Sequence, residues 1–181
     1  MKWSFCNINS ITEIEYNAIY NSLSPSRKAH IDKMKRREDR LRSLAVGHVL
    51  IGLLKEYGET NITLETLPNG KPNLVGSDLF FSLSHSHEGV VAVVSKSPIG
   101  IDIEKIKPVD DKLIDYVCNQ KEKEYVLQNE AEKFYRFFTV WTAKEAYFKK
   151  CNGTIASVKS VDTTLLQKNV ILKDDFVITI L

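Results

Sequence analysis

Two acidic residues on one alternating segment are the first sign of chemistry in this chain. Residues 99–104 read Ile-Gly-Ile-Asp-Ile-Glu. This period of two predicts a strand with one buried face, and it places the carboxylates of Asp102 and Glu104 together on the other face, about 7 Å apart along the backbone. We expect Gly100 to leave open space on that face. Two like charges at this spacing favour a hard cation with oxygen ligands, and the alternative is the solvated face of an edge strand.

A third acidic residue, Glu145, lies within a helical pattern. Large residues recur every three or four positions in residues 132–150, which predicts a helix with one core-facing stripe. The stripe comprises Phe134, Phe138, Trp141, Glu145 and Phe148. A buried carboxylate needs a cationic neighbour. Lys149, one turn later, is one candidate. The other is a cation shared with the acidic strand, in which case Lys144 and Lys149 flank an anionic substrate.

Basic residues are concentrated locally, although the net charge is only +2. Residues 27–42 contain eight lysines and arginines against three acidic residues, and we expect one basic helix that continues to residue 57. It could bind phosphates, receive an acidic partner, or simply be solvated. A nucleic-acid-binding module is a further alternative, but the segment has almost no aromatic residues and the pI is about 8.3, which is low for a dedicated binder.

The remaining pattern predicts a mixed chain of 181 residues. We expect strands over 3–8 and 90–94, a short strand from residue 80 leading into a polar loop through 87, and strands again in 157–181. Helices are expected over 12–23, from Ser24-Pro25 onward, and over 111–118 and 121–129. Three cysteines without a Cys-x-x-Cys motif favour a reducing cytoplasm. We expect neither a signal peptide nor a membrane-spanning segment.

Four short motifs occur in a fixed order along the chain. They are Gly-Lys-Pro at 70–72, Phe-Ser-Leu-Ser-His-Ser at 81–86, Ile-Gly-Ile-Asp-Ile-Glu at 99–104 and Trp-Thr-Ala-Lys-Glu-Ala-Tyr-Phe-Lys at 141–149. Over residues 20–155 the chain resembles the surfactin-synthetase-activating type of 4'-phosphopantetheinyl transferase, in the holo-acyl-carrier-protein synthase superfamily. The resemblance implies transfer of the phosphopantetheine arm of coenzyme A to a serine of an acyl- or peptidyl-carrier protein, releasing adenosine 3',5'-bisphosphate, in lipid or secondary metabolite biosynthesis.

The resemblance also implies roles for individual residues. It implies that Mg²⁺ is held by Asp102, Glu104 and Glu145. Catalysis would involve Glu145, Lys149 at the diphosphate, and Glu122 as a general base. The coenzyme A nucleotide would be bound by Arg27, Lys28, Lys71, Ser84 and His85, and its diphosphate by Lys149.

For the fold, the resemblance implies an α+β protein with two similar α/β halves, related by a pseudo-two-fold axis, with the active site between them. The first half, residues 1–97, would bind the nucleotide, and the second, residues 98–181, would hold the metal and perform catalysis. A monomer with no nucleic-acid or membrane partner is expected. Two departures are a glycine-poor stretch at 151–155 and an early end at Leu181. The alternative enzyme is another Mg²⁺-dependent phosphoryl-transfer enzyme or nuclease, which leaves Lys71, Ser84 and His85 unexplained.

Overall fold

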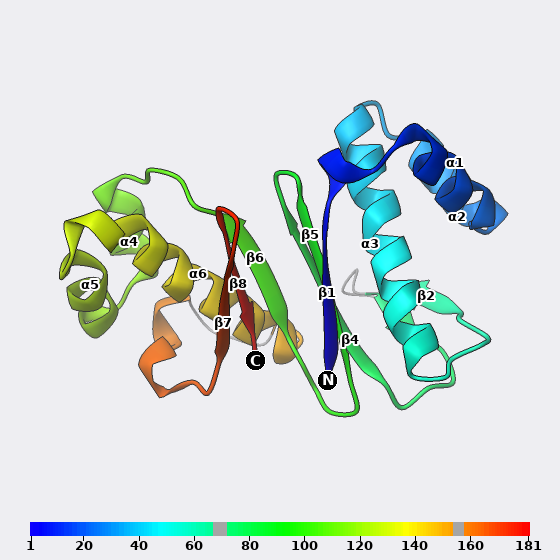
Figure 1. Ribbon diagram of the computed structural model, residues 1–181. Coiled ribbons are helices and arrows are strands. Elements are labelled where there is room, and N and C mark those ends of the chain that lie inside the picture. Colours follow the sequence, from blue (N-terminus) through cyan, green and yellow to red (C-terminus); the bar gives the residue numbers. More distant parts are fainter. Residues whose placement is uncertain (67–71, 154–157) are drawn as a thin grey trace. The chain divides into compact units, whose positions relative to one another are not determined.

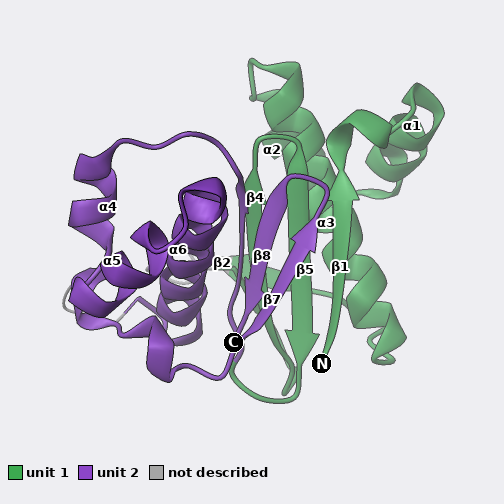
Figure 2. Cartoon of the chain, turned by 60° about the vertical axis from the view of Figure 1, so that its left-hand side comes forward, with its two compact units in different colours: residues 1–98 green, residues 99–181 purple. Residues whose placement is uncertain are grey.

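The chain forms two compact units, residues 1–98 and residues 99–181 (Figure 2). The computed structural model describes residues 1–66, 72–153 and 158–181. The division falls one residue after the boundary expected from the sequence. Each unit combines helices with antiparallel strands (Figure 1), so the predicted α+β class is confirmed.

Unit 1 is built around a three-stranded antiparallel sheet with the strand order β1-β5-β4. The strands are β1 (Lys2–Asn7), β4 (Phe80–Ser86) and β5 (Gly89–Ser95). The long helix α3 (Arg37–Glu56) packs on this sheet, and α1 (Glu13–Ser22) and α2 (Pro25–Asp32) precede it. A separate short pair consists of β2 (Leu64–Thr66) and β3 (Pro72–Leu74).

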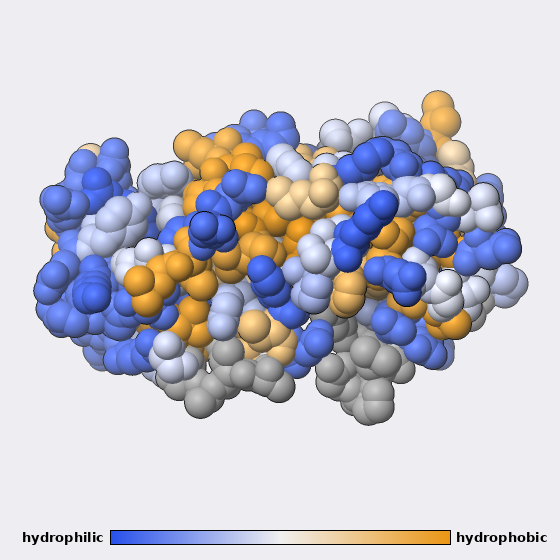
Figure 3. All heavy atoms as spheres, turned by 90° about the horizontal axis from the view of Figure 1, so that it is seen from below, coloured by the Kyte–Doolittle hydropathy of each residue, from blue (hydrophilic) through white to orange (hydrophobic). Residues whose placement is uncertain are grey.

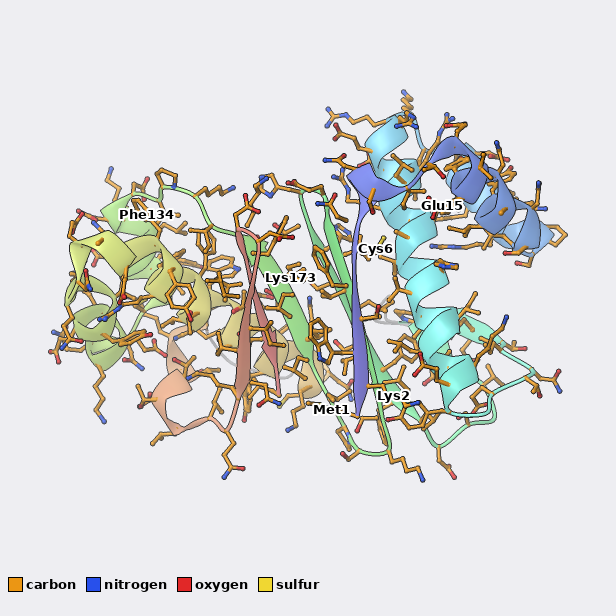
Figure 4. All side chains as sticks on the ribbon, in the orientation of Figure 1. Met1, Lys2, Cys6, Glu15, Phe134 and Lys173 are labelled. Atoms are coloured by element: carbon orange, nitrogen blue, oxygen red, sulfur yellow. The ribbon has the colours of Figure 1, made fainter. Side chains whose placement is uncertain are left out.

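The core of unit 1 lies between α3 and the sheet. Leu50 and Leu54 of α3 belong to the same buried cluster as Phe81 of β4 and Ala92 of β5. Cys6 projects from β1 toward this cluster (Figure 4). Because side chains alternate along a strand, Leu83 and His85 share the helix-facing side with Phe81, whereas Ser84 lies on the other side.

Unit 2 has a second three-stranded antiparallel sheet, with the order β6-β8-β7. Its strands are β6 (Ile101–Lys105), β7 (Asn169–Lys173) and β8 (Phe176–Ile180). The long helix α6 (Lys133–Lys150) packs on β6 and β8, and α4 (Asp111–Val117) and α5 (Gln120–Leu127) precede it. Both units therefore share one topology, in which a strand and a long helix are followed by a hairpin whose last strand lies in the middle. The predicted two-fold relation between the halves stays a prediction.

Local sequence signals explain where several helices begin. Thr12 and Glu15 form a reciprocal capping box at the start of α1, and Ser24 caps α2 with Pro25 in the first turn. Asn119 and Glu122 form the same kind of box at α5. These side chains satisfy backbone N–H groups that have no partner inside the helix, so the helix starts could be predicted closely.

The predicted single basic helix over 27–42 is wrong. The helix α2 ends at Asp32 and α3 begins at Arg37, so four residues connect two helices. A continuous helix would crowd like charges onto neighbouring turns, which is unfavourable. The connection is instead stabilised by Arg40, whose Nε donates to the Met34 carbonyl oxygen at 2.7 Å.

In two further segments, the secondary structure differs from the one predicted. The strand β4 continues to Ser86 because every residue from Phe80 to Ser86 pairs with β5, and the turn that follows contains His87 in a left-handed conformation, φ 51°. The segment after residue 157 begins with 3₁₀ turns at Val158–Ser160 and Thr163–Leu165 rather than a strand. Asp162 accepts hydrogen bonds from the backbone and hydroxyl of Thr164, and such local bonds compete with strand pairing.

The prediction of which face of α6 packs against the core is wrong. The buried row that meets the sheet contains Phe138, Thr142 and Ala146, whereas Phe148 is 40% exposed. Small side chains at 142 and 146 let the helix approach the strands closely, which a row of aromatic rings would prevent.

Hydrophilic residues cover much of the face seen in Figure 3, and hydrophobic residues are exposed among them. None of the described helices is both long and apolar enough to cross a membrane.

The three cysteines are free thiols, and we predict that they differ in reactivity. Burial raises the pKa of Cys118 to about 11, with Glu122 contributing to the shift. At pH 8 roughly one Cys118 in a thousand would be a thiolate, the form that reacts with alkylating reagents. Mass spectrometry after iodoacetamide treatment should therefore find Cys118 modified last, and guanidinium should abolish the difference. Early modification of Cys118 in the folded protein would contradict this assignment.

Candidate functional site

Asp102 lies on the helix-covered face of the sheet in unit 2. It is directly opposite Thr179 in the β6–β8 register, and Glu104 is opposite Val177. Opposed residues of an antiparallel pair project to the same face, and Thr179 Oγ1 lies 2.7 Å from Thr142 Oγ1 of α6. Asp102 is only 4% exposed. The alternative of a solvated strand face is therefore wrong for this residue.

The cation beside Asp102 is Lys149. Its Nζ donates to Asp102 Oδ1 at 2.7 Å, and the two side chains expose 27% and 5% of their area. The second carboxylate oxygen of Asp102, Oδ2, is buried and accepts no hydrogen bond in the described part of the chain. Lys149 thus links α6 to β6, a contact that the helical spacing of Lys149 and Glu145 did not predict.

Gly100 brings α6 and β6 together at this point. A Cβ atom at position 100 would lie 1.9 Å from the Ala146 carbonyl oxygen and 2.9 Å from the Lys150 backbone nitrogen. The expected open space beside Gly100 is therefore wrong, because the backbone of α6 occupies it. This close approach allows Lys149 to reach the strand.

Glu145 experiences the charge of the acidic strand. It is half-buried, and its pKa is raised mainly by burial and then by the negative charges of Asp102 and Glu104, while Lys149 opposes the shift. The three carboxylates therefore interact electrostatically. Within the described residues, no group of three or more such side chains is placed to hold a metal ion, so their convergence on one metal stays a prediction.

The chemistry of these donors fits a hard divalent cation. Three carboxylates supply oxygen ligands of the kind that Mg²⁺ prefers, and the ion pair with Lys149 neutralises the charge of one of them. A divalent cation would relieve the repulsion that raises the pKa of Glu145.

Lys144 and Glu122 occupy a different place from the predicted one. Lys144 is 2% exposed and Glu122 is fully buried, and they form an ion pair with an N···O distance of 2.8 Å. Lys144 therefore does not flank a substrate. Glu122 also accepts hydrogen bonds from the backbone of Asn119 and from the backbone and hydroxyl of Thr163. Glu122 is thus held in the interior beside a small cavity of about 250 Å³, which it lines together with Thr163 and Lys168, and its role as a general base stays a prediction.

A cavity of about 540 Å³ in unit 1 has Arg27 in its wall. The Arg27 Nη2 donates to the Ser43 carbonyl oxygen and to Ser43 Oγ, both at 2.8 Å. Apolar side chains of α3, β2 and β4 supply much of the remaining wall, and the exposed His30 lies at the same cavity. An arginine beside an apolar wall suits a flat ring system that carries an anionic group.

The other residues predicted to bind the nucleotide have surroundings that differ from those of Arg27. Lys28 lies over the Tyr20 ring and donates to the Asn21 carbonyl oxygen at 3.0 Å, so it does not line this cavity. Ser84 and His85 lie on β4 but on opposite faces of the sheet. Lys71 lies outside the described residues.

One residue that lines the unit 1 cavity and one that supports it were not predicted from the sequence. Ser43 holds Arg27 in place, and Gly47, one turn later on α3, forms part of the wall. A Cβ atom added at Gly47 would meet no heavy atom within 4 Å, so the wall is open at this point. In the sequence, Ser43 and Gly47 are two small residues four positions apart, a spacing that places them on one face of a helix.

Comparisons with known proteins identify relatives of the chain. The family model for the 4'-phosphopantetheinyl transferase superfamily matches residues 98–176, which include the acidic site. The 4'-phosphopantetheinyl transferase gsp of Aneurinibacillus migulanus is 34% identical over 148 residues, covering 78% of this chain and 61% of the relative. The transferase psf-1 of Bacillus pumilus is 41% identical over 90 residues, covering 49% and 39%.

The same relationship extends to Bacillus subtilis. Its 4'-phosphopantetheinyl transferase Sfp is 27% identical over 146 residues, covering 77% of this chain and 65% of the relative. The chain thus spans less than two thirds of the length of each of these three relatives. The family model and the relatives agree with the motifs, and residues 98–176 of the chain belong to the 4'-phosphopantetheinyl transferase superfamily.

Proposed function

We propose that the protein transfers the 4'-phosphopantetheine arm of coenzyme A to a serine hydroxyl of an acyl- or peptidyl-carrier protein and releases adenosine 3',5'-bisphosphate. The observation that carries this proposal is the site formed by Asp102, Lys149 and Glu145, which lies inside the segment matched by the family model. The names of the relatives support the same reaction.

The reaction requires a nucleophilic oxygen to attack one phosphorus of a diphosphate. The serine oxygen forms a bond to the phosphorus that carries the pantetheine arm, and the bond from this phosphorus to the bridging oxygen breaks. The hydroxyl proton leaves the serine, and the adenosine bisphosphate takes the electron pair of the broken bond. Catalysis of such a step depends on positioning and on neutralising negative charge.

Two side chains of unit 2 match these needs. We assign to Lys149 the role of holding the diphosphate, because its ammonium group is fixed at the edge of the acidic site and is still partly exposed. We assign to Glu145 the role of accepting the serine proton, because burial and nearby negative charge raise its pKa and so increase its basicity.

We propose that Asp102, Glu104 and Glu145 hold Mg²⁺. When bound, the cation would neutralise charge on the diphosphate oxygens. Glu145 then contributes either as a ligand or as the proton acceptor, and its position beside the acidic strand suits both.

We assign nucleotide binding to unit 1 and catalysis to unit 2. The Arg27 cavity would receive the adenosine 3'-phosphate end, with Lys28, Lys71, Ser84 and His85 as further candidates. One chain contains both units, so we propose a monomer, and the free cysteines suit action in the cytoplasm.

Intact mass spectrometry tests the proposal directly. The full chain is incubated with coenzyme A, Mg²⁺ and an apo-carrier protein, and the expected product is a carrier protein heavier by one phosphopantetheine group. A carrier whose acceptor serine is replaced by alanine is the matched control. No mass gain with fatty acid, polyketide and peptide carrier proteins would overturn the proposal.

We predict that Arg27→Ala weakens binding of coenzyme A more than it slows chemistry. The KM for coenzyme A should rise about tenfold, the scale of one charged hydrogen bond, with a smaller change in kcat. Steady-state kinetics with coenzyme A and with dephospho-coenzyme A would measure it, because only the former carries the 3'-phosphate. Lys55→Ala, which removes an exposed cation at the end of α3, is the control. An equal effect of Arg27→Ala on both substrates would exclude contact with the 3'-phosphate.

A further inference from the structure

An ion pair inside unit 2 is almost entirely shielded from solvent. Lys144 Nζ lies 2.8 Å from Glu122 Oε2, and the two side chains expose 1% and 0% of their area. Lys144 immediately precedes Glu145 on α6. The proposed chemistry gives this pair no role, although Lys144 is the sequence neighbour of the proposed proton acceptor.

The pair joins three segments that are distant in sequence. Lys144 Nζ also donates to the Val158 carbonyl oxygen at 2.9 Å. Glu122 Oε2 accepts from the Asn119 backbone at 2.9 Å, and Oε1 accepts from the Thr163 backbone and hydroxyl at 2.9 and 2.8 Å. The start of α5, the segment 158–163 and the middle of α6 are therefore connected through two side chains.

These contacts constrain the rotation of α6 about its axis. On another side of the helix, Thr142 bonds to Thr179 of β8 and Ala146 meets Gly100. Successive helical residues differ in direction by about 100°, so fixing residues 142, 144 and 146 also fixes the direction of Glu145. That direction brings Glu145 within the electrostatic influence of Asp102.

We propose that Glu122 and Lys144 act as a positioning pair that orients Glu145, and that Glu122 does not transfer a proton. The effect on catalysis rests on the proposed function, whereas the effect on the orientation of α6 does not. Full burial of Glu122 and the use of both its oxygens as hydrogen-bond acceptors support a positioning role.

Variants that remove a charge but keep nearly the same side-chain size can distinguish positioning of Glu145 from proton transfer by Glu122. Glu122→Gln retains an acceptor oxygen, and Lys144→Met retains an unbranched chain, but each leaves the other charge buried and unpaired. The double variant Glu122→Gln/Lys144→Met removes both charges, which often restores a core that a single change disrupts. Ile114→Ala serves as the control for lost stability, because Ile114 is buried in α4 outside the pair.

The measurements are kcat of the transfer and the backbone amide NMR resonances of Glu145 and Ala146. We expect each single variant to lose up to about 10²-fold in kcat, the scale for a small displacement of a reacting group. Both resonances should shift in the single variants. In the double variant, kcat should return to within about tenfold of the wild type and both resonances should move back, because positioning rather than proton transfer is affected. Ile114→Ala should lower the melting temperature and leave both resonances in place.

A role in proton transfer predicts a different pattern. Glu122→Gln would then lose roughly 10²–10⁴-fold in kcat, and the double variant would stay equally slow. That result would overturn the proposal, and so would single variants with unshifted resonances. If a single variant does not fold, the kcat of the double variant alone distinguishes positioning from proton transfer. If the wild type transfers nothing, the proposed function fails, and the resonances still decide whether the pair positions α6.

Discussion

Replacing Lys149 by alanine should lower the turnover of the proposed transfer by roughly 10²–10³-fold, the loss expected for one preorganised charge donor. Lys149 Nζ is held 2.7 Å from Asp102 Oδ1, so its ammonium group is in place before a diphosphate binds. The variant should also be less stable by about 1–3 kcal/mol, because Asp102 then keeps a buried charge without its ion-pair partner. The partial exposure of Lys149 lets solvent screen part of this loss.

Single-turnover rates and thermal melts, measured on the same samples, separate the two effects. Rates should be taken well below the melting temperature of the variant, so that all of it is folded. Lys150→Ala is the matched control, because Lys150 is the next residue and is exposed at the end of α6, and its variant should melt and react like the wild type. If Lys149→Ala melts lower but turns over at a nearly normal rate, Lys149 only neutralises carboxylates and has no place in the mechanism.

The second large effect is expected from Gly100→Ala. The new methyl group would lie 1.9 Å from the Ala146 carbonyl oxygen and 2.8 Å from the carbonyl carbon. Both atoms are backbone, so no side chain can move aside and α6 itself must shift. Overpacking of a core costs typically about 1–3 kcal/mol, and we expect the upper end of that range here. For a chain of this size, about 3 kcal/mol corresponds to a fall in Tm of roughly 6–12 °C.

Gly100→Ala should also reduce turnover, because α6 carries both Glu145 and Lys149. A shift of about 1 Å in reacting groups can cost about 10²-fold in rate. Calorimetry and single-turnover kinetics check the two parts. Gly52→Ala in α3 is the control, since a Cβ there meets no heavy atom within 4 Å, and alanine in place of glycine inside a helix should stabilise by about 1 kcal/mol. Gly100→Ala melting like the wild type would show that the strand and helix are less closely packed.

Local sequence patterns determined much of the fold of both units. Alternation at 99–104 predicted β6 and the shared face of Asp102 and Glu104, because the side-chain period of a strand is a property of its backbone. Thr12 and Ser24 marked the starts of α1 and α2 because the capping bonds join residues three positions apart. For residues 27–42 the prediction of a single helix was wrong. Charge counts do not show where a helix must break so that Ile31 and Leu41 are buried on separate helices.

Only the tertiary structure decided how the candidate site is assembled. The sequence grouped Asp102, Glu104, Glu145 and Lys149 through motifs, and helical spacing suggested Lys149 as the partner of Glu145. In the structure, Lys149 reaches Asp102 on β6, because Gly100 lets the backbone of α6 approach the strand. Lys144 and Glu122 were expected near the substrate, but they pair in the interior. The rotation of a helix against a sheet depends on side-chain volumes and buried partners from distant segments, which no local pattern contains.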